Sequence, residues 1–183
     1  ANTQTGAVKI SDTTGTIAAT TLTDITAQTS GTVTAAAAGI TITGTTTEVK
    51  AAIVTEATKA VMANGKVRLT DTGTVAATVL SGIGAITEGT VTVNGAMTIT
   101  GSTEEIKNAL VTETSKVIAT TSANVTFVGD NPTGAELADI NDAAGGTITL
   151  ANNAQTFTGT AAVMKSAFAG GLANTQTGAV TIS

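Results

Sequence analysis

The sequence predicts an α/β fold: a tandem-repeat solenoid of about three β-α-β-β-α units stacked along one axis. Three observations support this prediction. Residue types recur with a period of about 58 residues. Some short segments alternate apolar and polar residues as strands do, while others have helical spacing. The apolar side chains are mostly small, with three Phe and no Trp or Tyr, which favours thin stacked layers over one large core.

The repeat is visible at several positions of equivalent phase. The opening octapeptide ANTQTGAV (1–8) recurs unchanged at 173–180, and GTVT at 31–34 returns at 89–92 and, as GTIT, at 146–149. The expected units are repeat 1 (8–66), repeat 2 (67–124), repeat 3 (125–179) and the start of a fourth repeat (180–183), with 1–7 as the end of a preceding repeat. No Pro/Gly/Ser-rich linker separates them, which argues against a string of small separate domains.

Each repeat is expected to contain the same elements, and the second illustrates them. In order, these are a strand with Val67 and Leu69, a short helix with Val79, Leu80, Ile83 and Ile86, two Thr-alternating strands at 90–93 and 97–100, and a longer helix with Ile106, Leu110, Val117 and Ile118 facing inward. Asn94-Gly95, between the two strands, is typical of a hairpin, although a solenoid corner would use the same residues.

Three capping boxes mark expected helix starts. Thr45 with Glu48 and Ser102 with Glu105 begin the longer helices of repeats 1 and 2, and Thr133 with Glu136 begins the short helix of repeat 3. In repeat 3 the longer helix is expected to start at Thr160, with Val163 in place of the Glu. Gly170 and Gly171 follow, so we expect this helix to be shorter.

Composition excludes several functional classes. The net charge is -5, and the chain has neither the basic patch nor the aromatic platform that nucleic acid needs. No apolar stretch reaches about 18 residues, so we expect no membrane span. Without His or Cys, the usual general base and the thiol nucleophile are missing. We therefore expect no enzyme, no catalytic residue and no bound cofactor other than a calcium ion.

Four residues are candidate calcium ligands. Asp12, Asp71 and Asp130 lie near strand-to-helix junctions, and Asn131 adjoins the last of them. Their oxygens are the hard ligands that Ca²⁺ prefers, although neither an EF-hand loop nor a calcium-binding nonapeptide is present. The alternative is that each Asp turns or caps its loop through its side chain. A change in melting temperature on adding EDTA would support the calcium site.

Thr-x-Thr triplets such as Thr98-Ile99-Thr100 place two hydroxyls on one face of a strand. In a stack of repeats they would form Thr ladders similar to the ice-binding faces of Thr-rich β-solenoid antifreeze proteins. The simpler interpretation is that Thr is a good strand former, and that alternation turns Val or Ile inward and Thr outward.

The strongest sequence pattern combines V-x-L-x-D-T-x-T-V (67–75), L-x-x-I (80–83), G-T-V-T (89–92) and I-T-G-S-x-x-E-I (99–106). It resembles tandem repeats in very large secreted proteins of cyanobacteria and other marine bacteria. Repeat 3 departs from the pattern where Gly129 replaces Asp71 and Val163 replaces the Glu. The resemblance implies a surface-layer (S-layer), adhesin or motility-associated role, and it transfers no functional residues.

These observations predict a structural repeat segment of a large bacterial cell-surface or extracellular protein, whose export signal lies outside this sequence. It would act as a stiff scaffold or self-assembling element. Its expected partners are neighbouring repeats of the same chain or other copies end to end. The alternative is an adhesin or ligand-binding repeat, either calcium-dependent or ice-binding. The lack of Trp and Tyr disfavours sugar binding.

Overall fold

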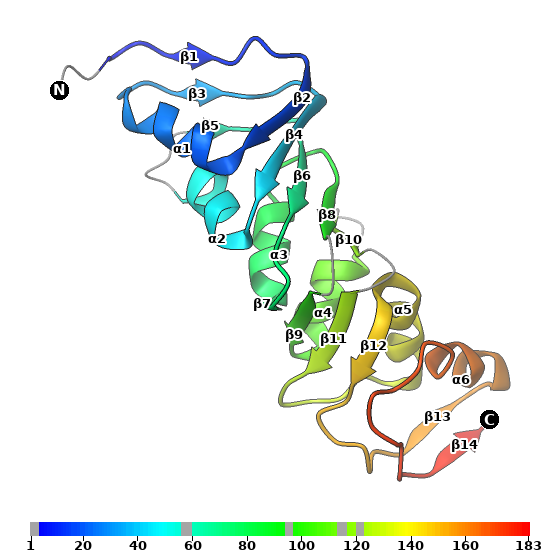
Figure 1. Ribbon diagram of the computed structural model, residues 1–183. Coiled ribbons are helices and arrows are strands. Elements are labelled where there is room, and N and C mark those ends of the chain that lie inside the picture. The colour runs from blue at the N-terminus through cyan, green and yellow to red at the C-terminus, as the bar shows by residue number, and fades with distance from the viewer. Residues whose placement is uncertain (1–3, 56–59, 94–96, 113–116, 120–122) are drawn as a thin grey trace.

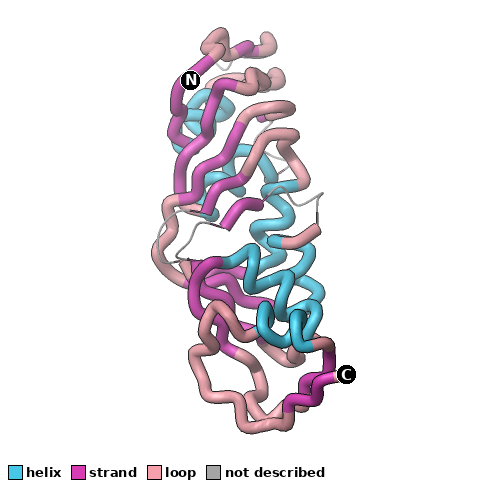
Figure 2. Tube along the Cα trace, turned by 90° about the vertical axis from the view of Figure 1, so that its right-hand side faces the viewer, coloured by secondary structure: helices cyan, strands magenta, loops and turns pink. Residues whose placement is uncertain are grey.

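The computed structural model describes residues 4–55, 60–93, 97–112, 117–119 and 123–183. They form a mixed α/β structure with an elongated body, in which strands lie along one side and helices along the other (Figures 1 and 2). The elements are β1 (Val8–Lys9), β2 (Thr14–Ala18), α1 (Ala19–Ala27), β3 (Val33–Thr34), β4 (Gly39–Gly44), α2 (Thr46–Val49), the π-helical η1 (Lys50–Val54), β5 (Ala60–Val61), β6 (Lys66–Leu69), β7 (Thr74–Ala76), α3 (Ala77–Gly84), β8 (Val91–Val93), β9 (Thr98–Gly101), α4 (Thr103–Leu110), β10 (Val117–Ala119), β11 (Ala123–Phe127), α5 (Gly134–Ala144), β12 (Gly145–Thr149), β13 (Phe157–Gly159), α6 (Ala161–Ala167) and β14 (Val180–Ile182).

All strand pairs among the described residues are parallel. The sheets have the orders β1-β3-β5, β10-β8-β6-β4-β2, β12-β11-β9-β7 and β13-β14. Paired residues are 22 to 27 positions apart in the chain. We call the residues that lead from one strand to its parallel neighbour a passage. The residues from Ile42 to its partner Val67 are one example. Parallel neighbours require such crossover connections, and here the helices supply them.

Apolar and polar residues alternate along the strands, and the apolar ones face inward as predicted. One inward row contains Ile42, Val67 and Val91, which are in register with each other and at most 1% exposed. The adjoining outward row contains Thr43, Arg68 and Thr92, so a charged side chain interrupts the row of Thr hydroxyls. The prediction of apolar residues inward and Thr outward is therefore confirmed, but this Thr ladder is not continuous.

The period of about 58 residues spans two passages. The helices α1, α3 and α5 begin at Ala19, Ala77 and Gly134, which are 58 and 57 residues apart. The helices α2, α4 and α6 begin at Thr46, Thr103 and Ala161, which are 57 and 58 residues apart. Each sequence repeat thus contains two helices of successive passages.

The expected β-α-β-β-α order was incomplete. Strands β2 and β7 directly precede α1 and α3, and β5 and β10 follow the second helix of each of the first two repeats. The relative helix lengths were also wrong, because α3 and α4, the two helices of repeat 2, have 8 residues each. Asn94 and Gly95 lie outside the described residues, and the flanking β8 and β9 belong to different sheets rather than to a hairpin.

The second helix of repeat 2 ends earlier than predicted. Helix α4 stops at Leu110, and Val117 and Ile118 lie in β10, where the Ile118 side chain is 51% exposed. The Lys107 carbonyl accepts hydrogen bonds from the Thr112 amide (2.9 Å) and hydroxyl (3.2 Å). This Thr ends the helix because its side chain competes for the carbonyl, and β-branched residues are poor helix formers.

The predicted helix starts are confirmed. Complete capping boxes are present at Thr45 with Glu48, at Ser102 with Glu105 and at Thr133 with Glu136. Thr160 also caps α6, where its side chain accepts a hydrogen bond from the Val163 amide. Helix α6 has seven residues, one fewer than α4.

One continuous apolar cluster fills the space between the strands and the helices. Its members are mostly Val, Ile, Leu and Ala, and Leu80, Ile99 and Ile106 are each 0% exposed. The aromatic contribution is concentrated near the C-terminal end, where Phe157 and Phe168 meet edge to face at 5.5 Å between ring centroids. In the described part of the chain, no helix is long and apolar enough to cross a membrane.

Glycines allow successive passages to approach closely. A Cβ at Gly31, Gly89 or Gly146 would lie only 2.4, 2.3 or 2.3 Å from a carbonyl oxygen of the preceding passage. No side chain fits at such a distance, so these positions require Gly for steric reasons. By contrast, a Cβ added at Gly82, inside a helix, would have no described atom within 4 Å.

These two kinds of glycine should respond oppositely to the same substitution. We expect Gly89→Ala to lower the free energy of unfolding by about 1–3 kcal/mol, because the new methyl overlaps the Gly65 carbonyl. We expect Gly82→Ala, inside α3, to raise it by about 0.5–1 kcal/mol through helix propensity. Urea unfolding followed by circular dichroism measures both. A neutral Gly89→Ala variant would contradict the close approach of the passages.

Candidate functional site

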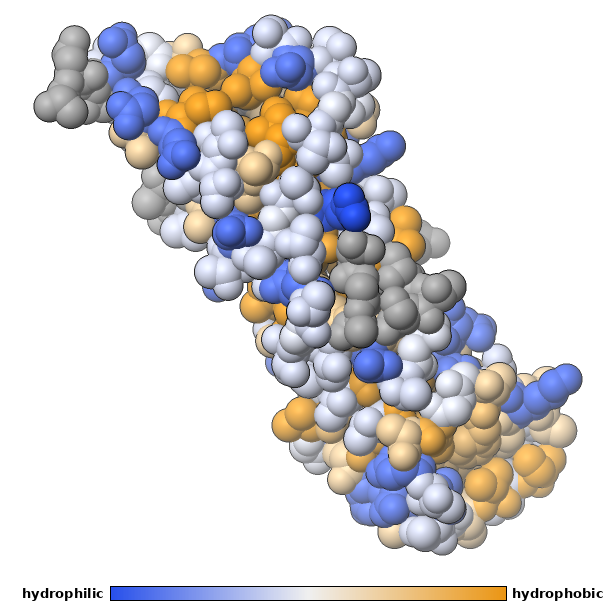
Figure 3. Space-filling model, viewed as in Figure 1, coloured by the Kyte–Doolittle hydropathy of each residue, from blue (hydrophilic) through white to orange (hydrophobic). Residues whose placement is uncertain are grey.

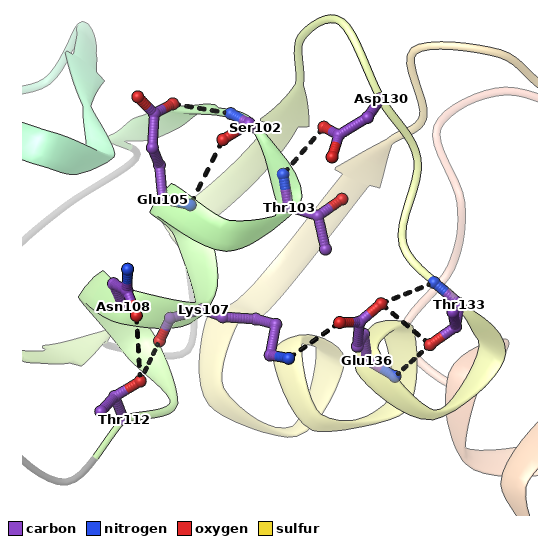
Figure 4. A network of polar contacts seen from close by, with 9 residues as sticks. All are labelled: Ser102, Thr103, Glu105, Lys107, Asn108, Thr112, Asp130, Thr133 and Glu136. Carbon is purple, nitrogen blue, oxygen red and sulfur yellow. Dashed lines mark hydrogen bonds and ion pairs between the residues drawn. The ribbon is translucent and has the colours of Figure 1, made fainter.

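A shallow groove recurs on the helical side of the body. The first groove, between α2 and α3, is lined by residues including Thr46, Lys50, Thr55 and Val79. The second, between α4 and α5, is lined at the equivalent positions by Thr103, Lys107, Thr112 and Glu136, together with Asp130 and Asn131. The second groove therefore contains more charged residues than the first and two of the four calcium candidates, and Figure 4 shows its polar contacts.

Asp71 caps a helix of the preceding passage. Its carboxylate accepts hydrogen bonds from the amide (2.7 Å) and hydroxyl (2.9 Å) of Thr46, which lies 25 residues earlier as the first residue of α2. An anion is favourable at a helix N-terminus, where amides lack intrahelical partners. Asp71 therefore joins two passages through a helix end that Thr45 and Glu48 already cap locally.

Asp130 makes a weaker version of this contact. Its Oδ1 accepts a hydrogen bond from the amide of Thr103, the first residue of α4, at 2.9 Å (Figure 4). The buried Thr103 hydroxyl has no hydrogen-bond partner among the described residues, whereas the equivalent Thr46 hydroxyl binds Asp71.

An extra residue explains the difference. The amide of Thr70 binds the Gly44 carbonyl, and Asp71 follows directly; the amide of Val128 binds the Gly101 carbonyl, but Gly129 comes before Asp130. Gly129 has a φ of +89°, which favours Gly. The loop it forms brings Asp130 to the helix end. Asp130 thus takes the role of Asp71, and the alignment of Asp71 with Gly129 in the sequence did not reveal this.

The other two calcium candidates bind no helix start among the described residues. The Asn131 side chain pairs with the backbone of Asn152, donating to its carbonyl and accepting from its amide. Asp12 is exposed on the first passage. Within the described residues, no group of three or more His, Cys, Asp or Glu side chains could hold a metal ion. The structure places Asp71, Asp130 and Asn131 in contacts between passages, and calcium binding stays a prediction.

An ion pair joins α4 to α5 in the second groove. The Lys107 ammonium lies 2.8 Å from Glu136, which also accepts hydrogen bonds from the Thr133 amide and hydroxyl, each at 2.9 Å (Figure 4). The Lys107 hydrogen bond and then the Thr133 amide lower the pKa of Glu136 to about 2. The hydrogen bond to Glu136 raises the pKa of Lys107, so this lysine stays protonated near neutral pH and is a poor base or nucleophile.

Sequence reasoning missed this ion pair. Its partners are 29 residues apart on different helices, so neither helical spacing nor the repeat indicates it. The equivalent positions in the first groove are Lys50 and Val79, which cannot form an ion pair. The groove therefore keeps its shape between repeats but not its chemistry.

Comparison of the chain with protein-family models, curated proteins and solved structures gave no match. The function must therefore be inferred from the geometry. In the described residues, Asp71, Asp130 and the Lys107–Glu136 pair bind helix starts or side chains of adjacent passages. This arrangement stabilises the packing of one passage on the next.

The three aspartates form a graded series for testing these contacts. Asp71→Ala removes two hydrogen bonds to α2 and should lower the free energy of unfolding by about 1–2 kcal/mol. Asp130→Ala removes one and should cost about 1 kcal/mol. The matched control Asp12→Ala changes an exposed side chain and should stay within about 0.5 kcal/mol of the parent. Equal losses in urea unfolding for all three would contradict the capping role.

The ion pair predicts a pH dependence. The folded-state pKa of Glu136 lies below its ordinary value of 4.5, so its stabilisation is present above about pH 4.5 and is lost as the pH falls toward 2. Because the Lys107 and Glu136 side chains are 36% and 28% exposed, we expect about 1 kcal/mol or less. Glu136→Gln should lower stability at pH 6 and have little effect near pH 2.

The matched control is Glu105→Gln, which alters the capping box at Ser102 without an ion pair in the described residues. Urea unfolding of both variants at several pH values separates the two contributions. If Glu105→Gln and Glu136→Gln are equally destabilised at pH 6, the ion pair adds nothing to the capping box.

Proposed function

We propose that this chain is a non-enzymatic structural segment of a large bacterial cell-surface or extracellular protein. In this proposal it forms a stiff α/β solenoid of about three repeats, each made of two passages. The observation that supports the proposal most directly is that Asp71 and Asp130, at equivalent places, each bind a helix start of the preceding passage. A function based on one catalytic pocket would not require the same contact twice.

The mechanism would be mechanical. Each passage pairs with its neighbours through parallel backbone hydrogen bonds and close glycine contacts. The length of such an array grows with the number of repeats, because each unit contacts only adjacent units. The outward Thr hydroxyls and the net charge of -5 would keep the rod hydrated.

Two further features support this proposal over a binding module or an enzyme. In the second groove, Glu136 binds Lys107 and the Thr133 cap, and Asp130 binds the start of α4, so these carboxylates have fewer free acceptors for a ligand. The acidic, Thr-rich and Cys-free composition, with its resemblance to repeats of secreted proteins, supports export to the cell surface. End-to-end partners, either adjacent repeats or other copies, follow from the stacking.

Immunogold electron microscopy of intact source cells, with an antibody raised against this chain, tests the proposed function. We expect dense labelling at the cell surface, arranged as a lattice or along protruding fibres. A pre-immune serum is the control for non-specific binding. Label confined to the cytoplasm would contradict the proposal and would favour an enzyme or an internal binding module.

A further inference from the structure

The two grooves of the helical side contain a lysine at the same position, Lys50 in the first groove and Lys107 in the second. The backbone around each lysine is also alike. Its carbonyl accepts hydrogen bonds from the amide and hydroxyl of a threonine, at 3.0 and 3.2 Å from Thr55 and at 2.9 and 3.2 Å from Thr112. The two lysines therefore start from matching backbone positions, and a difference between their partners comes from the facing helix.

The facing helix supplies a carboxylate in the second groove but not in the first. Glu136 of α5 lies 2.8 Å from the lysine of the second groove. In the first groove Val79 takes the place of Glu136, and α3 has no charged residue. Lys50 is exposed and makes no ion pair or side-chain hydrogen bond with any residue that the structure describes. The first groove thus has the cation of the second groove without its counter-ion.

Acidic side chains around α2 do not supply the missing charge. Glu48 and Asp71 both accept hydrogen bonds from amides at the start of α2. Thr47 from α2 and Thr74 from β7 line the same groove as Lys50 and add hydroxyl groups to it. An ammonium with hydroxyls near it suits a carboxylate, because hydrogen bonds to an ionised acceptor are the strong ones. The first groove therefore fits a carboxylate that comes from another molecule.

Helix α5 displays carboxylates that have no counter-ion. Asp139 and Asp142 follow Glu136 at three-residue spacing, so the three acids lie along one side of the helix. Asp139 and Asp142 are both exposed, and neither forms an ion pair in the described part of the chain. Glu136 already pairs with a lysine of the facing helix. The acidic side of α5 therefore has the chemical group that the first groove lacks.

The first groove and the acidic side of α5 lie on the same side of the body, because both belong to the row of helices (Figures 1 and 2). On the face that Figure 3 shows, apolar residues gather toward the two ends, and the coloured surface between them is mostly neutral with scattered charged residues. A contact away from the ends consequently depends more on charge pairing than on apolar burial. Salt should weaken such a contact, because it screens exposed charges.

We propose that two copies of this chain pair through their helical sides, so that Asp139 and Asp142 of one copy bind Lys50 in the first groove of the other. An antiparallel arrangement makes this contact twice, once in each direction, and relates the two copies by a two-fold axis. The inference rests on the self-assembling part of the proposed function and names a lateral surface for it. All the residues it uses lie within the described body, so the contact is equally open to this chain as part of a longer array.

Reversal of one charge tests the groove. In the full 183-residue chain, Lys50→Glu places a like charge against Asp139 and Asp142 and should weaken association at least about tenfold. The matched control Lys66→Glu makes the same change on β6, on the strand side of the body, and should leave association unchanged. Sedimentation velocity over a concentration series measures the dimer. The parent dimer should itself weaken when the salt concentration is raised from about 0.01 M to about 1 M.

Mixing of two reversed variants separates a lost contact from a folding defect. The double variant Asp139→Lys/Asp142→Lys should not associate with itself, because its new lysines face Lys50. When it is mixed with Lys50→Glu in equal amounts, association should return to near the parent level, because both contacts of the mixed dimer then join opposite charges. Circular dichroism checks that each variant is folded.

A third variant gives the first groove a counter-ion of its own. Val79→Glu reproduces the position of Glu136 in the second groove, so the new carboxylate competes with the second copy for Lys50. Association should weaken at least about fivefold. The matched control Val79→Gln adds the same bulk without the charge and should keep most of the association.

Four outcomes would overturn this inference and leave the scaffold function standing. Association that survives both Lys50→Glu and the double Asp variant would place the contact on another surface. Loss in both variants without recovery on mixing would show that the two surfaces do not face each other. Equal weakening by Lys66→Glu would assign the effect to net charge. A parent chain that stays monomeric at low salt to millimolar concentration would exclude the dimer, whereas the scaffold function would still be decided by labelling of the cell surface.

Discussion

Parallel backbone pairing between strands 22 to 27 residues apart is the constraint on which the rest of this structure depends. Because parallel neighbours cannot be joined by a tight turn, each passage must cross over, and a helix is the compact way to do so. The helices consequently begin at similar places beside the strands. Loops of the following passage then lie next to those helix starts, where unpaired amides attract a carboxylate.

The position of the helix starts changes how the acidic residues of the loops are interpreted. Acids near strand-to-helix junctions suggested calcium ligands, yet Asp71 and Asp130 bind amides of α2 and α4. A capping carboxylate and a calcium ligand occur in similar loop sequences, because both need an exposed oxygen beside a turn. The position of the neighbouring helix start accounts for the capping contacts, and calcium binding stays a prediction.

Local signals were predictable from the sequence, and contacts between passages were not. The capping boxes at Thr45, Ser102 and Thr133 could be predicted because each involves residues three positions apart. The two passages within each sequence repeat were not recognised, because their helix starts differ: α2 and α4 begin with capping boxes, whereas α1 and α3 have no side-chain cap. The Lys107–Glu136 contact depends on the register of two helices, and the Asp130 contact depends on the positive φ of Gly129, neither of which is encoded in a short motif.

The division of the strands into four sheets has a mechanical consequence. The same two passages are joined by β6 with β8 in the five-stranded sheet and by β7 with β9 in the four-stranded sheet, and the next two by β8 with β10 and by β9 with β11. Two ladders in different sheets therefore join each of these pairs of passages. If one ladder opens, the second ladder still joins the same two passages, so the passages keep their register.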